Sequence, residues 1–373
     1  MSNDSSPPFC GSELVTFQKV YAHNIHGYAS LLICVMGSMA NLMNIVVLTR
    51  KDMISPTNVV LTGLAIADLA VLLEYIPYTL HTYLRPPSHS VKDRYTYGWA
   101  MLVLWHSNFS QVFHTISIWL TVVLAVWRYI AVAYPQKNRD WCNMDTTYVA
   151  VIAGYILCPL LCVPVFLSFN VMPVVELLDD NGFQTKNHTI GTNTTVYVVT
   201  MSEIVKTNFI KDLNFLIYSV LFKLTPSVAL TVLSLRLVCA LLETKKRRQK
   251  LTSSLNRKNA KNAEKEKQTD RTTRMLLAVL ILFLVTEVPQ GILGLLTVIF
   301  GEKFFKDCYQ KLGEVADILA LINSAINFAL YYVMSRQFRT TFKALLSYNT
   351  FPARKHTPFN DINNHTTTQI TQV

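Results

Sequence analysis

Four carboxylates stand inside long apolar stretches of this sequence, where a charge is costly. Asp68 lies in LAIADLAVLL and Glu74 follows directly after it, while Glu287 lies in FLVTEVPQGIL and Asp317 in VADILALI. A carboxylate withdrawn from water must find a cation, take up a proton or be hydrogen-bonded by its neighbours. The residue types therefore point to cation binding, either of a small ion that prefers oxygen ligands or of a positively charged ligand group. For Glu74 and Glu287, a structural role as protonated groups bonded between helices stays open.

Seven apolar segments carry these side chains, and each is long enough to span a membrane. A spanning helix needs about 20 mostly apolar residues. The composition agrees, because 15% of the residues are charged, whereas soluble domains carry about 25%. The sequence predicts an all-α membrane protein, a seven-transmembrane helix bundle. Its segments cover residues 27–49, 57–84, 99–133, 146–170, 207–241, 271–300 and 313–334.

The formal net charge of +11 is concentrated on one side of the predicted bundle. Residues 243–274, between segments five and six, hold twelve Lys and Arg side chains against four acidic ones, and the stretch after segment seven is also basic. Basic loops stay on the cytoplasmic side, so we expect a multi-pass plasma-membrane protein with its N-terminus outside. The basic loop is expected to contact anionic lipid, with a merely solvated loop as the alternative.

The expected organisation has five parts, which follow from these segments. They are an extracellular tail (1–26), the bundle (27–334), the third cytoplasmic loop within it (243–274), a short amphipathic membrane-surface helix (335–347) and a disordered cytoplasmic tail (348–373). Glycosylation sequons on the expected outer side begin at Asn3, Asn187 and Asn193. The chain ends with Thr371 and Val373 in a pattern that fits a PDZ-domain ligand.

Several short motifs stand on particular segments and in a particular order. LAIAD lies in segment two, WRYIAVAYP at the end of segment three and NFALY in segment seven, while Pro226 and Pro289 interrupt segments five and six. Over residues 27–347 this set resembles the rhodopsin-like (class A) G-protein-coupled receptors. SIWLTVVLAVWRYIAV, TEVPQGILGLL and INSAINFALYYVMSRQFR are similar to the invertebrate myosuppressin and FMRFamide-like peptide receptors, the branch that includes the insect sex peptide receptor.

The resemblance implies two sites within the bundle. A buried sodium site falls on Asp68, Ser117, Asn323, Ser324 and Asn327, and its alternative is a plain hydrogen-bond network between helices. Contact with a heterotrimeric G protein falls on Arg128, Tyr129 and Tyr331. The pattern departs from the family at three positions, because Trp127 replaces an acidic residue, Phe328 a proline and Glu287 a tryptophan.

The resemblance also implies the ligand, an amidated neuropeptide that ends in Arg-Phe-amide, with coupling to an inhibitory-type G protein and with arrestin as a further partner. Another peptide or a small amine is the alternative ligand. The polar side chains near the outer ends of segments two, three, six and seven suit such a ligand, because carboxylates pair with Arg, and His and Gln with an amide. The predicted ligand-binding residues are Glu74, Tyr78, Gln111, His114, Glu287, Gln290 and Asp317.

Cysteine usage differs from most of that family, which links the top of segment three to the second outer loop. Neither region contains Cys here, and of the seven cysteines Cys10 and Cys308 fall on the oxidising outer side. We predict a Cys10–Cys308 disulfide, with two free thiols as the alternative. No cysteine follows Cys308, so palmitoylation of the surface helix is not expected.

Two other functional classes are weaker. A secondary transporter predicts inverted repeats with broken helices in corresponding halves, and the sequence has neither. A membrane hydrolase predicts clustered His and acidic metal ligands, whereas the nine His are scattered. We therefore expect a receptor and not an enzyme, with no cofactor other than an allosteric sodium ion.

Overall fold

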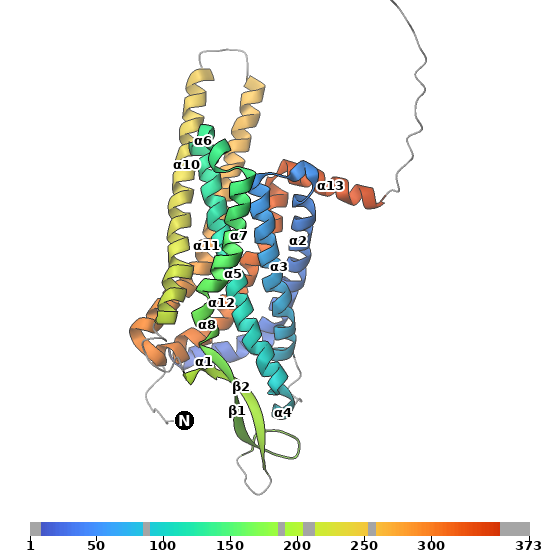
Figure 1. Ribbon diagram of the computed structural model, residues 1–373, viewed down its shortest axis with the longest axis vertical. Helices are drawn as coiled ribbons and strands as arrows, with labels where there is room; N and C mark the ends of the chain where they lie inside the picture. The colour runs from blue at the N-terminus through green and yellow to red at the C-terminus, as the bar shows by residue number, and fades with distance from the viewer. Residues whose placement is uncertain (1–8, 85–89, 186–190, 204–212, 253–258, 351–373) are drawn as a thin grey trace, which may run out of the picture.

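The computed structural model describes residues 9–84, 90–185, 191–203, 213–252 and 259–350. Seven of the described helices are long and apolar enough to cross a membrane. They form an up-and-down bundle (Figure 1), as the sequence predicts. The spanning helices are α2 (Gly27–Leu48), α3 (Pro56–Thr82), α5 (Tyr97–Ala133), α7 (Met144–Leu161), α10 (Thr225–Thr252), α11 (Asn259–Phe304) and α12 (Gln310–Met334).

Shorter elements mark the two ends of the bundle. One end carries the strands β1 (Phe169–Leu178) and β2 (Thr192–Met201) with the helices α1 (Ser12–Tyr21), α4 (Val91–Arg94) and α8 (Val163–Phe166), and is called the hairpin end below (Figure 1). The other carries α6 (Pro135–Trp141) and α13 (Arg336–Thr350), and is called the α13 end. Residues η1 (Ala22–His26), η4 (Ile217–Leu224) and η5 (Phe305–Tyr309) are π-helical, and η2 (Lys51–Met53) is a 3-10 turn.

Helix starts in the bundle are set by capping side chains. The hydroxyl of Ser55 accepts a hydrogen bond from the backbone N–H of Asn58 at the start of α3, where Pro56 occupies the first helical position. Thr96 caps α5 and Asn143 caps α7 in the same way. Such caps satisfy backbone donors that have no partner within the helix.

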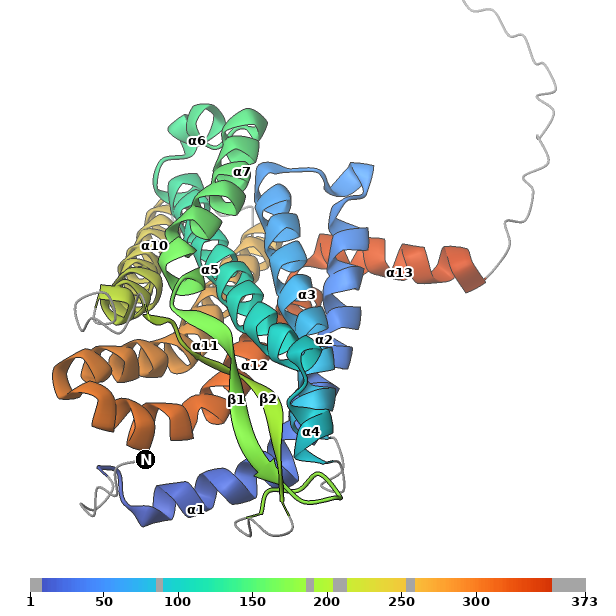
Figure 2. The same ribbon diagram turned by 60° about the horizontal axis from the view of Figure 1, so that its bottom comes forward.

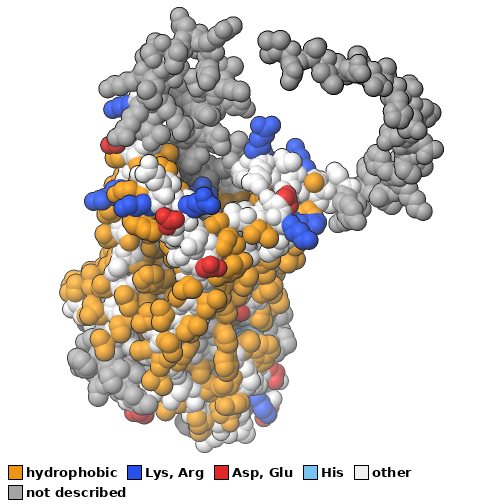
Figure 3. Space-filling view, turned by 45° about the horizontal axis from the view of Figure 1, so that its top comes forward, with side chains coloured by type: hydrophobic (Ala, Val, Ile, Leu, Met, Phe, Trp, Pro, Cys, Tyr) orange, Lys and Arg blue, Asp and Glu red, His pale blue; other side chains and the backbone are white. Residues whose placement is uncertain are grey.

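The bundle surface is apolar on its sides. Figure 3 shows hydrophobic side chains covering the flank of the bundle, with most Lys and Arg side chains above this band, toward the α13 end. Inside, Val60 and Leu64 of α3 pack with Ile116 and Leu120 of α5 in the main hydrophobic cluster. Helices that are apolar all round are typical of a membrane span, and this arrangement places the charged end outside the hydrocarbon.

The hairpin is a feature that the sequence pattern does not predict. Its strands pair antiparallel from Phe169 opposite Met201 to Leu178 opposite Thr192. The predicted fourth segment, 146–170, is therefore too long, because α8 ends at Phe166 and the chain becomes extended at Phe169. The residues from there to Leu178 include Val171, Val174 and Val175, and β-branched side chains favour strands.

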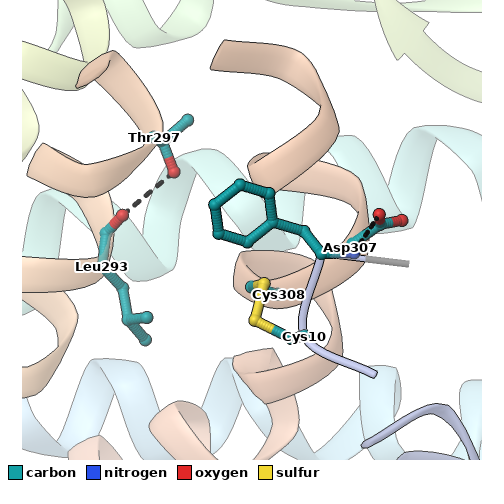
Figure 4. The surroundings of a disulfide bond; sticks show 6 residues. Cys10, Leu293, Thr297, Asp307 and Cys308 are labelled. Carbon is teal, nitrogen blue, oxygen red and sulfur yellow. Dashed lines mark hydrogen bonds between the residues drawn. A yellow bond between two sulfur atoms is a disulfide. The ribbon is translucent and has the colours of Figure 1, made fainter. Parts of the chain in front are cut away.

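A helix also lies within the predicted extracellular tail. Helix α1 packs against α12 and crosses the hairpin end of the bundle (Figure 2). Cys10 and Cys308 form a disulfide, which confirms that prediction. Beside it the backbone N–H of Phe9 donates to Asp307 Oδ2 at 2.9 Å (Figure 4). The Phe9 ring contacts those of Phe300 and Phe304.

Helix α13 follows the seventh span after a single residue, Ser335. Its Phe338 is buried in a cluster with Tyr331 and Met53, so its apolar side faces the bundle. The helix continues to Thr350, whereas the predicted tail begins at 348. Thr371 and Val373 lie outside the described residues.

The disulfide generates a prediction about stability. Replacing Cys10 or Cys308 by Ser removes a cross-link between positions 298 residues apart, so either variant should lower the thermal unfolding temperature of the purified protein. The double variant should fall no further than the singles, because both remove the same bond. Cys239→Ser is the matched control, since Cys239 is a free, exposed cysteine. Additive losses, or alkylation of both cysteines without reductant, would contradict the bridge.

Candidate functional site

Asp68 lies at the centre of a buried polar cluster. Its Oδ1 accepts a hydrogen bond from Ser117 Oγ and its Oδ2 one from Asn327 Nδ2, each at 2.7 Å. Ser324 is buried close by, and its carbonyl accepts from Asn41 Nδ2 at 2.9 Å. Among the described residues, Asn323 is not one of the side chains that donate a hydrogen bond to Asp68. The cluster therefore joins α2, α3, α5 and α12 around one carboxylate.

The donor set of this cluster suits a small hard cation. One carboxylate with hydroxyl and amide oxygens is the ligand type that such ions prefer. No Lys or Arg of the described chain forms an ion pair with Asp68. A sodium ion bound there would supply one positive charge against one buried negative charge. The residues present therefore fit the ion that the resemblance implies.

A second polar layer lies nearer the hairpin end, between α3, α5 and α12. His106 Nδ1 is 2.6 Å from Glu74 Oε2, and the His106 ring stacks on Tyr78 with centroids 3.8 Å apart. Tyr75 Oη donates to Asp317 Oδ2 at 3.2 Å, and its ring contacts that of His106. The predicted residues Glu74, Tyr78 and Asp317 are thus brought together. Glu74 has an internal partner, while Asp317 is only half-buried and is held by a neutral hydroxyl.

A third layer is a buried ionic group around Glu287. Lys223 Nζ lies 2.7 Å from Glu287 Oε2, and His114 Nε2 lies 3.1 Å from Oε1. Glu287 is fully buried, Lys223 is 1% exposed and His114 is 6% exposed. The expectation that Glu287 awaits a ligand cation therefore needs correction, because η4 of the same chain supplies the cation. Breaking such a buried pair costs about 3–5 kcal/mol, since one charge is left uncompensated.

Gln290 links this ionic group to the second layer. It lies one turn after Glu287 on α11, accepts a hydrogen bond from Tyr218 Oη at 3.3 Å and donates to the carbonyl of Ala316 at 2.8 Å. Ala316 precedes Asp317 on α12. Gln111, by contrast, bonds along its own helix to Thr115 Oγ1 at 3.1 Å. Gln290 thus belongs to the site, whereas the described bonds of Gln111 are local.

One member of the site, Lys223, is not among the residues predicted from the sequence. Lys223 stands in FLIYSVLFKLTPSVAL, an apolar stretch in which it is the one charged residue. A cation in one span and a carboxylate in another are expected to pair, because an isolated charge in hydrocarbon is too costly. That signal was available in the sequence.

The α13 end holds the residues predicted to contact a signalling partner. Arg128 is half-buried toward the α13 end of α5 and lies within electrostatic range of Tyr331 of α12. Tyr331 is buried against Phe338. Trp127, which stands in place of an acidic neighbour, donates from Nε1 to Thr147 Oγ1 of α7 at 2.9 Å. Tyr129 packs edge-on against Tyr134.

The remaining predicted sites concern the hairpin end. Asn193 is exposed on β2, where a glycan can be accommodated. Asn3 and Asn187 lie outside the described residues.

Among the described residues, no three His, Cys, Asp or Glu side chains cluster as metal ligands.

The sequence is similar to those of known proteins. A family model described as the serpentine type 7TM GPCR chemoreceptor Srw matches residues 28–349. The chain is 32% identical to the G-protein coupled receptor dmsr-1 of Caenorhabditis elegans, over 86% of this chain and 68% of that protein. It is 30% identical to the sex peptide receptor of Drosophila melanogaster, over 87% of this chain and 73% of that protein.

A more distant relative is the FMRFamide receptor of Drosophila melanogaster, 22% identical over 83% of this chain and 52% of that protein. These relatives are receptors and not enzymes. The family match covers the seven spans and the polar layers between them. The chain therefore belongs to the rhodopsin-like G-protein-coupled receptors, in the group of neuropeptide receptors.

Proposed function

We propose that this chain is a plasma-membrane receptor for an amidated neuropeptide that ends in Arg-Phe-amide, of the myosuppressin and FMRFamide type. It transmits binding to a heterotrimeric G protein of the inhibitory class. The hairpin end then faces the outside, with the N-terminus, and the α13 end faces the cytoplasm. The names of two relatives, an FMRFamide receptor and a sex peptide receptor, support a peptide ligand.

The observation that carries the proposal is the state of Asp317. Among the described carboxylates of the two layers nearer the hairpin end, Glu74 and Glu287 already have a basic partner, His106 and Lys223. Asp317 instead accepts one bond from the neutral Tyr75 and is half-buried. It is thus the carboxylate best placed to pair with the guanidinium of a ligand arginine.

The α13 end supports coupling to a G protein. Arg128 has no acidic neighbour at position 127, and the indole of Trp127 is bonded to α7 instead. Helices α10 and α11 extend well beyond the bundle at this end (Figure 1). They carry the basic stretch 243–274 toward the side where a G protein docks. Arrestin would bind the same side, and a PDZ protein the C-terminus at Thr371 and Val373.

The Asp68 cluster completes the proposal as a sodium site. Asp68, Ser117 and Ser324 would provide oxygen ligands, with Asn323 and Asn327 beside them. The ion would offset the charge of Asp68 inside the bundle. Sites for glycans at Asn3, Asn187 and Asn193 would all lie outside the cell.

A peptide panel tests the function directly. Cells that express the receptor with a promiscuous G protein should respond to peptides ending in Arg-Phe-amide and respond far less to the free acids. In cells with native G proteins, pertussis toxin should abolish the response, because it blocks the inhibitory class. Responses confined to amines, lipids or unrelated peptides would refute the ligand class, and toxin-insensitive signalling would refute the coupling.

Asp317→Asn tests the arginine contact. Loss of a charge-assisted hydrogen bond should raise the half-maximal peptide concentration by about 10- to 100-fold, with surface expression unchanged. The same substitution should have little effect on a peptide whose Arg is replaced by uncharged citrulline. Glu176→Gln is the matched control, since Glu176 is a carboxylate of the hairpin that bonds Gln184. An equal loss for both peptides would remove Asp317 from the contact.

Arg128→Ala tests the coupling face. Signalling should be abolished while peptide binding to intact cells is retained, because Arg128 lies at the end of the bundle opposite the ligand. Arg139→Ala is the control, since Arg139 is a basic residue of α6 at the same end. Full signalling by the Arg128 variant at normal expression would contradict the assigned role.

A further inference from the structure

His114 has one ring nitrogen that the protein leaves unused. Nε2 faces Glu287, and among the described residues Nδ1 is buried without a hydrogen-bond partner. The residue is 6% exposed, so bulk water does not satisfy this nitrogen. A buried polar atom without a partner costs about 1–3 kcal/mol. Such an atom at the floor of a ligand site is a position that a ligand group can satisfy.

The ionic group around His114 fixes the character of that nitrogen. Lys223 and Glu287 form an ion pair, and a carboxylate in that pair offers acceptors only. The nitrogen that faces it, Nε2, therefore carries the proton. Lys223 already supplies one positive charge to Glu287, so we infer a ring that carries a single N–H, at Nε2. Nδ1 then carries a lone pair, so it accepts a hydrogen bond and cannot donate one.

Amidated and free-acid peptides differ in the group that such an acceptor distinguishes. A terminal carboxamide carries two N–H donors, whereas a terminal carboxylate carries acceptors only and a negative charge. The carboxamide can donate to Nδ1. The carboxylate has no N–H to donate and would face the lone pair of Nδ1. A site built around a hydrogen bond rejects an analogue that cannot make it.

The position of His114 matches the spacing of an Arg-Phe-amide terminus. Gln290 lies one turn after Glu287 and bonds the carbonyl that precedes Asp317, so the layers of His114 and Asp317 are neighbours. One helical turn rises about 5.4 Å, a distance that an arginine side chain and the next residue span. A guanidinium at Asp317 therefore leaves the terminal amide free to approach His114.

We propose that His114 selects the amidated C-terminus of the peptide by accepting an N–H at Nδ1, with Glu287 and Lys223 as positioning residues that fix its ring. This inference rests on the proposed function and names the receptor group that reads the amide. The buried ionic group then distinguishes an amidated from a free-acid C-terminus, whereas Asp317 binds the ligand arginine.

The test compares one peptide with four C-termini: the primary amide, the N-methylamide, the N,N-dimethylamide and the free acid. The dimethylamide is uncharged but has no N–H, so it separates hydrogen bonding from charge. On the wild-type receptor the primary amide and the N-methylamide should be active. The dimethylamide should be weaker by about tenfold, and the free acid weaker still.

Receptor variants complete the test. His114→Phe should lower the potency of the primary amide to that of the dimethylamide and leave the dimethylamide unchanged. His114→Gln, which keeps one donor and one acceptor, should restore part of the preference. His81→Phe is the control, since His81 is a buried histidine of α3 that donates from Nε2 to the carbonyl of Arg94 and belongs to neither polar layer. It should leave the amide-to-dimethylamide ratio as in wild type.

The outcomes separate this inference from the proposed function. A wild-type receptor that responds equally to the amide and the dimethylamide overturns the role of His114 and leaves the peptide assignment standing. A His114→Phe receptor that keeps the wild-type ratio also overturns it. If His114→Phe does not reach the surface, the wild-type ratios and His114→Gln still decide. Silence of the wild type toward all four peptides overturns both.

Discussion

The interior of the bundle is an apolar medium in which each charged side chain needs an ion-pair or hydrogen-bond partner. This constraint determines where the polar residues lie. Within the spans, the carboxylates lie at different depths, and each forms a polar layer with its partners. Asp68 accepts hydrogen bonds from Ser117 and Asn327, and Glu74 pairs with His106. Glu287 forms an ion pair with Lys223. Because each pairing joins at least two helices, the same contacts that solvate the charges also fix how the helices pack.

The departures from the usual family pattern become coherent under this constraint. A glutamate at position 287 would be an orphan charge if Lys223 did not reach it from η4. Because Trp127 stands where the family has an acidic residue, Arg128 lacks that acidic neighbour. The Trp127 indole instead donates a hydrogen bond to Thr147. The packing of the helices therefore depends on different bonds from those that the motifs alone suggest, with an ionic link between η4 and α11.

The sequence was sufficient for the features that depend on composition and strong periodicity. Apolar length predicts the seven spans, and the cysteine distribution predicts the Cys10–Cys308 bridge, which the structure contains. The pairing of buried charges was less accessible, because Lys223 and Glu287 are 64 residues apart and no local pattern connects them. The hairpin was missed for a related reason. Strand pairing between Phe169 and Met201 depends on a partner across a turn, and the apolar residues after Phe166 look like a continued helix.

The covalent link at the hairpin end has a consequence for the mechanics of the molecule. The bond between Cys10 and Cys308 closes a ring that contains every span except α12, and the chain leaves this ring only at η5. In space the residues around Phe9 are therefore part of the connection between α11 and α12, although they stand at the opposite end of the sequence. The disulfide and the packing of α1 on α12 tie the N-terminal segment to the hairpin end of α12. A reporter group attached just before Cys10 would sense the displacement of the sixth and seventh spans.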